Sequence, residues 1–359
     1  MSKQSQDMPK IAKYKPYYCE LSKGKKYFWC SCGLSKNQPF CDYSHVGTDF
    51  EPVAYQAKQD NEEVLFCGCK HNADGPFCDG SHNNLPGGYE YSDPDSKANK
   101  QIELVLGDAQ GVRALDGNCF VASSKRAPAK RYQNTKWAVL ISALQGSVHQ
   151  SLHYLRVAAD GKFSPNFSLA ESEISLLVSN GEGEIVISNK QFQLSQRDGV
   201  YIRAGEIFSV RSTSAAPMEL HLSVCPQHAE PIIVDCMLDN FDSSYPERVV
   251  PTDEAANRGV GDRFFQILVG KATGSTRLTQ FIGRIPTSMA AFHRHLYEES
   301  LVVLQGRGHM WSDTLKCEVH AGDIIFLPRK QLHSLQCDSA DGMVLVGFIY
   351  PGDNPSINY

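Results

Sequence analysis

The sequence predicts a mostly β protein in which a small cysteine-rich module precedes two larger β domains. Three observations support this prediction. A cysteine and histidine pattern repeats near the N-terminus, short β-rich runs with frequent turns fill the chain from about residue 101, and the second half of that β region has a weaker copy 125 residues upstream. The 359 residues suggest two or three domains, at roughly 150 residues per domain.

The composition limits the classes of protein. Hydrophobic residues make up 42% and charged residues 21% of the chain, so each domain can bury an ordinary core. No apolar run approaches the ~18 residues of a membrane span and the start is polar, so we expect a cytoplasmic protein with no membrane partner. A net charge of −5 gives no bulk electrostatic reason to expect nucleic-acid binding. Residues 1–27 are locally basic, which fits a solvated tail or a docking patch for an acidic redox partner.

The first unit is an internal repeat of potential metal ligands. At an offset of 37 residues, three cysteines and one histidine recur in the same order: Cys30, Cys32, Cys41 and His45, then Cys67, Cys69, Cys78 and His82. Three thiolates and one imidazole suit either zinc or an iron–sulfur cluster. The tight Cys-x-Cys spacing differs from the wider pair usual in zinc sites and favours an object with two metal ions.

These repeats resemble the CDGSH (NEET-type) iron–sulfur family, whose literal motif stands at residues 78–82. The resemblance implies one [2Fe–2S] cluster per repeat, and therefore two clusters held by the eight residues above. Single-motif members of the family dimerise, so the tandem repeat is similar to that dimer within one chain. Tyr43 replaces the motif glycine and Asn72 replaces a serine or threonine, but neither position is a ligand.

Residues 83–100 are rich in Gly, Pro, Asn, Asp and Ser, which is typical of a linker. The β-rich runs that follow predict a double-stranded β-helix or a sandwich. They are Trp137–Leu144, Glu173–Val178, Glu184–Ser188, Gly199–Ile202, Met218–Val224, Phe264–Val269, Leu278–Ile285, Leu301–Leu304, Asp323–Leu327 and Met343–Tyr350.

The second β domain contains a further set of potential metal ligands. His293 and His295 would project from one face if they lie on a strand, and Glu299 would reach the same point from the start of the next strand. Downstream, a Gly-Asp turn leads to His333. Nitrogen and oxygen ligands of this kind suit Fe(II), Mn(II), Ni(II) or zinc.

These residues resemble the two motifs of the cupin family, a double-stranded β-helix. The resemblance implies a mononuclear divalent metal centre with His293, His295, Glu299 and His333 as metal ligands and catalytic residues. Thr287 and Lys330 stand where the motifs usually have glycine, and neither is a ligand.

The copy at an offset of 125 residues has lost its metal ligands. The equivalent positions hold Ser168, Ala170, Ile174 and Phe208. The chain is therefore similar to a bicupin whose first barrel is structural. We expect core or surface roles for four first-barrel histidines, His149, His153, His221 and His228, and a core role for Cys337. Near the ligands, we expect structural roles for Arg294 and Glu298. A place at the pocket mouth stays an open alternative for His309 and Trp311.

The expected domains are 1–85 for the tandem CDGSH module, 86–104 for the linker, 105–245 for the metal-free cupin and 246–359 for the metal-binding cupin. The combination favours an oxidoreductase: a mononuclear Fe(II) oxygenase or dioxygenase acting on a small molecule, with O₂ as a partner and the two clusters supplying electrons or redox control. Two alternatives are a non-redox isomerase or hydrolase with Mn, Ni or Zn, and a redox-sensing, small-ligand-sensing or cluster-transfer protein. A redox partner protein and a homodimer are also expected.

Overall fold

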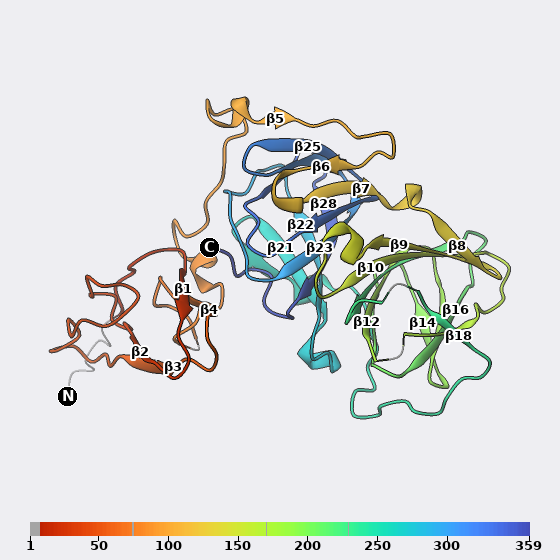
Figure 1. Ribbon diagram of the computed structural model, residues 1–359, viewed down its shortest axis with the longest axis horizontal. Helices are drawn as coiled ribbons and strands as arrows, with labels where there is room; N and C mark the ends of the chain where they lie inside the picture. The colour runs from red at the N-terminus through yellow and green to blue at the C-terminus, as the bar shows by residue number, and fades with distance from the viewer. Residues whose placement is uncertain (1–7, 74, 170, 229) are drawn as a thin grey trace.

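The computed structural model describes residues 8–73, 75–169, 171–228 and 230–359. Figure 1 shows three units in a row, with a small N-terminal module at one end and two β barrels beside it. Helical structure in these ranges is limited to short 3₁₀ turns: Ser81–Asn84, Asn99–Gln101, Asp116–Asn118, Ser124–Arg126, Ala143–Gln145, Glu254–Ala256 and Lys271–Thr273. The predicted mostly β fold is confirmed.

The N-terminal module consists of two small antiparallel sheets that each join one strand from either repeat. Strand β1 (Tyr17–Leu21) pairs with β4 (Glu62–Phe66), and β2 (Lys26–Trp29) pairs with β3 (Val53–Gln56). Their buried faces form one apolar cluster that includes Leu21, Trp29 and Phe66. The two repeats therefore share a core rather than fold separately.

The first barrel consists of a seven-stranded sheet, in the order β19-β15-β12-β17-β10-β9-β8, and a five-stranded sheet, in the order β14-β13-β16-β11-β18. Apolar side chains fill the space between them. The strands are β8 Ala129–Tyr132, β9 Thr135–Ile141, β10 Ser151–Val157, β11 Asn166–Ser168, β12 Glu173–Asn180, β13 Gly183–Ile187, β14 Lys190–Leu194, β15 Gly199–Ile202, β16 Ile207–Ser212, β17 Met218–Cys225, β18 Ile232–Val234 and β19 Val249–Val250.

The second barrel has an eight-stranded sheet, in the order β20-β21-β22-β28-β23-β26-β7-β6, and a four-stranded sheet, in the order β27-β24-β25-β5. Its own strands are β20 Arg258–Val260, β21 Arg263–Val269, β22 Thr279–Ile285, β23 Glu298–Gln305, β24 Arg307–Trp311, β25 Leu315–His320, β26 Asp323–Leu327, β27 Ser334–Cys337 and β28 Met343–Tyr350. The strands predicted from the β-rich runs lie in the sheets of the two barrels.

Strand pairing divides the chain differently from the expected boundary at residue 105. The segments β5 (Glu103–Leu104), β6 (Arg113–Ala114) and β7 (Phe120–Ser123) precede the first barrel in sequence but belong to the sheets of the second. Strand β7 pairs with β26, and β5 pairs with β25, so these segments cover edges that would otherwise be open.

The two large sheets pack against each other and build an apolar core between the barrels. Strand β28 shows this most clearly, because Leu345 and Ile349 face the interior of the second barrel while Val346 and Phe348 face the first barrel. Alternation with a period of two thus buries both faces of one strand.

Two buried glutamates form reciprocal contacts between the barrels. Glu298, at the start of β23, accepts hydrogen bonds from Ser147 Oγ at 2.6 Å and from the Val148 amide at 2.8 Å in the first barrel. Glu173, at the start of β12 in the first barrel, accepts from Ser275 Oγ at 2.9 Å in the second. We call this pair of contacts the glutamate clamp.

The N-terminal module contacts the second barrel through its second repeat and the segment after β28. Glu63 forms ion pairs with Lys330 and, at 3.1 Å, with Arg329, while Asn83 Nδ2 donates to the Ser356 carbonyl at 3.0 Å. An apolar cluster fills the contact: Leu65, Cys78, Leu296, Ile357 and Tyr359.

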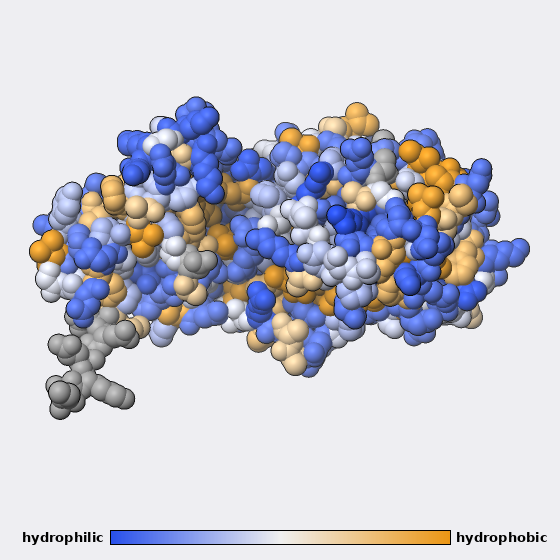
Figure 2. Space-filling model, turned by 90° about the horizontal axis from the view of Figure 1, so that it is seen from below, coloured by the Kyte–Doolittle hydropathy of each residue, from blue (hydrophilic) through white to orange (hydrophobic). Residues whose placement is uncertain are grey.

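The outer surface mixes hydrophilic and hydrophobic residues, and Figure 2 shows hydrophobic residues at the end formed by the first barrel. Ile232 and Ile233 of β18, a strand at the edge of its sheet, are about half exposed. Within the part of the chain that the structure describes, no helix is long and apolar enough to cross a membrane.

Candidate metal centres

The first predicted site, in the first repeat, brings its ligands together as two pairs. Cys30 follows directly after β2, and its Sγ lies 3.6 Å from Sγ of Cys32. Sγ of Cys41 lies 3.2 Å from Nδ1 of His45. Backbone amides donate to two of the sulfurs, which stabilises thiolates.

The second repeat has the same arrangement but is more deeply buried. Cys67 follows β4, with its Sγ 3.5 Å from Cys69 Sγ, and Cys78 Sγ lies 3.5 Å from Nδ1 of His82. The hydrogen bond with Cys67 lowers the pKa of Cys69 to about 7, whereas burial raises the pKa of Cys78 to about 12. Burial also lowers the pKa of His82 to about 4, so its imidazole is neutral, the form that binds metal.

The structure explains why Tyr43 can replace the motif glycine in the first repeat. Gly80 has a φ of 86°, and an added Cβ would lie 2.1 Å from Oγ of Ser356 in the second barrel. Tyr43, its counterpart in the first repeat, has a φ of 70° but is 77% exposed. The first repeat therefore accepts a side chain at this turn because no other module packs on it.

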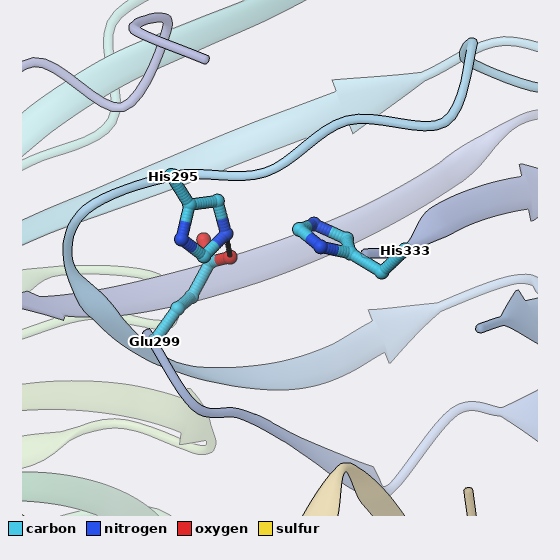
Figure 3. A group of neighbouring side chains, drawn as sticks. All are labelled: His295, Glu299 and His333. Atoms are coloured by element: carbon cyan, nitrogen blue, oxygen red, sulfur yellow. Dashed lines mark ion pairs between the residues drawn. The ribbon is translucent and has the colours of Figure 1, made fainter. Parts of the chain in front are cut away.

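The cupin site groups three of the four predicted ligands. Ligand atoms of His295, Glu299 and His333 all lie within 4.8 Å of one another, and Figure 3 shows the three side chains converging. His295 Nε2 is 3.0 Å from a carboxylate oxygen of Glu299. His293 lies beside this group, with its ring centroid 4.3 Å from that of His333.

The local structure agrees with the predicted position of Glu299 but not with the predicted strand that carries the two histidines. Glu299 is the second residue of β23 and faces the barrel interior together with Leu301. His293 and His295 do not lie on a regular strand, as the His-x-His spacing predicted, but in the segment between β22 and β23. An isolated bridge joins the backbones of His293 and His333 instead.

All three imidazoles are oriented in the same way. Nδ1 of each histidine is hydrogen-bonded at 2.9–3.0 Å to a backbone carbonyl two residues away, on Ala291, Tyr297 and Gln331 respectively. This contact leaves Nε2 of each ring available to a metal ion. Burial lowers the pKa of His293 to about 3 and that of His333 further, so both rings are neutral.

A single cavity joins the two kinds of site. Its volume is about 160 Å³, and its lining includes His82 from the second repeat together with His293, Glu299 and His333 from the second barrel. Lys15 and the linker residue Tyr89 complete the wall between the modules. We call it the shared cavity.

The other residues considered from sequence lie outside the shared cavity. Cys337 is buried in the barrel core, and His309 pairs with Asp338 at 2.8 Å on the outside. Trp311 is buried and donates to the Gln336 side chain. Neither His309 nor Trp311 lines the mouth of this cavity.

Two residues next to the ligands form hydrogen bonds outside the shared cavity. Arg294 donates to the Lys330 carbonyl at 2.6 Å, and Glu298 belongs to the glutamate clamp.

The first barrel offers no equivalent site among the residues that the structure describes. Ile174 and Phe208 are buried in its apolar core, and Ser168 is on β11; Ala170 lies outside the described residues. His153 accepts a hydrogen bond from Trp137 Nε1 at 3.0 Å, as expected of a core histidine.

The remaining first-barrel histidines likewise contact neighbouring side chains or the protein surface. His221 contacts Ser124 and Ser179, and His149 stacks on Tyr350, while His228 is partly buried.

Arg263 is a cavity residue that the motifs did not identify. It begins β21 and shares the interior face of that strand with Phe265 and Ile267. The only sequence signal was this alternation with a period of two, which places an arginine in register with two core residues.

Comparison with family models matches residues 7–46 to the iron-binding zinc finger of CDGSH type and residues 285–349 to the cupin domain. Over 53 residues, 14% of this chain, the sequence is 47% identical to the mitochondrial CDGSH iron-sulfur domain-containing protein 3 of Mus musculus. The chain spans 39% of the length of that relative.

Two solved structures resemble the barrels. Protein Ylba from E. coli has a TM-score of 0.52 at 15% identity, covering 67% of this chain and 94% of its own. Salicylate 1,2-dioxygenase from Pseudoaminobacter salicylatoxidans, solved with gentisate, has a TM-score of 0.51 at 13% identity, covering 64% and 80%. Such identities show the fold alone. The chain therefore joins a CDGSH iron–sulfur module to a cupin fold of two barrels, as its motifs predicted.

Proposed function

We propose that this fusion of CDGSH and cupin modules is a metal-dependent oxidoreductase. In this proposal the second barrel is a mononuclear Fe(II) oxygenase or dioxygenase acting on a small molecule, and two [2Fe–2S] clusters supply electrons or control its redox state. One observation carries the proposal: His82, a ligand of the second cluster, lines the same cavity as three of the proposed cupin ligands.

The arrangement of the ligands fits these cofactors. Two ligand pairs per repeat suit a cluster of two iron ions, each held by one pair, better than a single tetrahedral zinc ion. His293, His295, Glu299 and His333 would hold the mononuclear metal, and such a metal supplies open positions for O₂ and substrate. The neutral imidazoles of His293 and His333 need no proton loss before they bind it.

The two repeats suit different ends of an electron path. His82 is buried and faces the barrel, whereas the turn that carries His45 is flanked by exposed Tyr43 and Val46. We therefore assign electron entry from a redox partner protein to the first cluster and electron delivery to the second. Exposed apolar side chains around a cluster are suited to brief docking of such a partner.

Metal content tests the proposal directly. Full-length protein purified without oxygen is analysed by mass spectrometry, with EPR on the reduced sample. Two [2Fe–2S] clusters account for about four iron ions and a fifth occupies the cupin. Four irons with one Mn, Ni or Zn would contradict the oxygenase and favour Lewis-acid chemistry or ligand sensing.

A pair of variants tests whether the sites are separate. We expect His293→Ala to lose the fifth iron and to keep the cluster absorbance. His309→Ala is the matched control, because that histidine lies outside the shared cavity, and it retains all the iron. Loss of both absorbance and mononuclear iron in His293→Ala would contradict the separation.

For compartment and assembly we propose the cytoplasm and a homodimer. All twelve cysteines are free, as expected where thiols stay reduced. The edge strand β18, with Ile232 and Ile233 half exposed, is a surface on which two copies could pair. Cell fractionation and light scattering after size-exclusion chromatography test these two points.

A further inference from the structure

The shared cavity has an apolar body. Besides the polar residues named above, its wall contains Phe265, Phe281, Leu301, Met310 and Leu345, which belong to the core of the second barrel. A cavity of about 150 Å³ accommodates a molecule the size of benzene. The volume of about 160 Å³ therefore suits a ligand with one ring or a short branched chain.

Two hydrogen-bond donors in the cavity wall find no acceptor among the described residues of the protein. They are Nε of Arg263 and Nε2 of His82, a residue that is 2% exposed and whose Nε2 carries the ring proton when Nδ1 binds iron. The Arg263 guanidinium is held by a bond from Nη2 to the Leu335 carbonyl at 3.0 Å, and Asp262 is 4.0 Å away. Buried donors are nearly always paired, so both call for an acceptor from a ligand.

The charges in the wall favour a negative ligand. Arg263 lies on the interior face of β21, close enough to His293 to contribute to the lowering of its pKa. Lys15 and Arg284 also line the wall, against Glu90, which pairs with Lys15 at 3.0 Å, and the proposed metal ligand Glu299. Three cationic side chains against two carboxylates leave the wall with a net positive charge. Arginine is the side chain best suited to carboxylates, because its planar fork matches their two oxygens.

We propose that the shared cavity binds a small organic carboxylate with an apolar body, and that this ligand accepts hydrogen bonds from Nε of Arg263 and Nε2 of His82. The assignment of this ligand as the substrate rests on the proposed function. The binding site itself rests only on the cavity and its two donors.

The contact with His82 makes the second cluster sensitive to the ligand. Nδ1 of His82 faces Cys78 in the cluster site, so an acceptor on Nε2 changes how strongly the imidazole donates electrons to iron. The first cluster is an internal control. Nε2 of His45 lies 3.7 Å from Glu51, and His45 does not line the shared cavity.

The test uses full-length protein with both clusters intact and benzoate as the probe. Calorimetry measures its binding, and EPR of the reduced protein follows the two cluster signals during the titration. We expect one cluster signal to shift in proportion to the bound benzoate and the other to stay constant. Benzamide, which has the same shape without the charge, is expected to bind at least tenfold more weakly.

Variants at two arginines locate the site. We expect Arg263→Gln to weaken benzoate binding at least tenfold and Arg263→Lys to weaken it less. Arg307→Gln is the matched control, because Arg307 is exposed at the start of β24 and does not line the shared cavity, and it changes the affinity less than twofold. Preserved EPR of both clusters verifies that each variant is folded.

Several results would overturn the inference. They are absence of benzoate binding, equal affinity in Arg263→Gln, and binding that shifts both cluster signals or neither. None of these readouts depends on which metal occupies the cupin. If the cupin holds zinc, the oxygenase proposal fails while benzoate binding and the cluster shift persist.

Discussion

The glutamate clamp predicts a stability change that can be separated from a change in metal binding. Replacing Glu298 by alanine removes two short hydrogen bonds to a buried carboxylate, at 2.6 and 2.8 Å, and leaves the Ser147 hydroxyl buried. Each bond of this kind contributes about 1.5–3 kcal/mol. After allowance for the desolvation of the carboxylate, we expect the free energy of unfolding to fall by about 3–5 kcal/mol.

The change at Glu298 also bears on the cupin site. Its side chain anchors the start of β23 to the other barrel, and the next residue, Glu299, projects inward as a proposed ligand. We therefore expect Glu298→Ala to weaken metal binding. Glu173→Ala is the matched control, because it breaks the equivalent contact in the barrel that lacks a metal site, and it destabilises the fold without changing metal affinity.

Urea unfolding followed by tryptophan fluorescence measures the free energy of unfolding, since Trp137 and Trp311 report on one barrel each. Competition with a chelator measures the metal affinity. A loss of stability below about 1 kcal/mol in Glu298→Ala would refute the energetic reasoning. Equal weakening of metal binding in the two variants would refute the link between clamp and ligand.

Three further predictions follow from single residues. Burial lowers the pKa values of His153 and His221 to about 3, below an unfolded value of about 6.5, so the neutral histidines stabilise the fold fully above pH 6.5 and lose this effect as the pH falls toward 3. At pH 5 we expect the free energy of unfolding to be about 2 kcal/mol lower for each histidine, and an unchanged urea midpoint would contradict this. Tyr43→Gly relieves a left-handed backbone and is expected to stabilise the first repeat by about 0.5–1 kcal/mol, measured as a delayed thermal loss of its cluster absorbance. Gly80→Ala, by contrast, forces a Cβ against Ser356 and is expected to destabilise the second repeat by about 1–3 kcal/mol in the same assay, and equal effects of the two variants would contradict the packing argument.

The candidate ligands could be predicted from sequence because metal chemistry demands particular residue types at short, fixed spacings. Cys30 and Cys32 are two residues apart, and the structure keeps their sulfurs adjacent. The β fold could be predicted because alternation with a period of two is a local pattern. The His-x-His spacing could not show that His293 lies beside the group of His295, Glu299 and His333 rather than within it. A backbone bridge between His293 and His333, forty residues apart in sequence, sets this position.

Contacts between distant segments were beyond the reach of sequence patterns. No local feature shows that His82 would face a cavity in the second barrel, since that depends on how two folded modules dock. The pairing of β7 with β26 was hidden for the same reason, because a four-residue strand carries no mark of its partner. The role of Glu298 was expected to be structural, but its contact with Ser147 could be seen only in the folded protein.

The pairing of β7 with β26 has a consequence for the order in which the protein is made. β7 leaves the ribosome well before β26, which lies some 200 residues further along the chain. At about 5–20 residues per second, the wait for the partner strand is roughly 10–40 s. The strands β8–β19 of the first barrel are all synthesised within this interval. That barrel can therefore complete its sheets early, while β5–β7 keep open edges that chaperones would shield until the last hundred residues arrive.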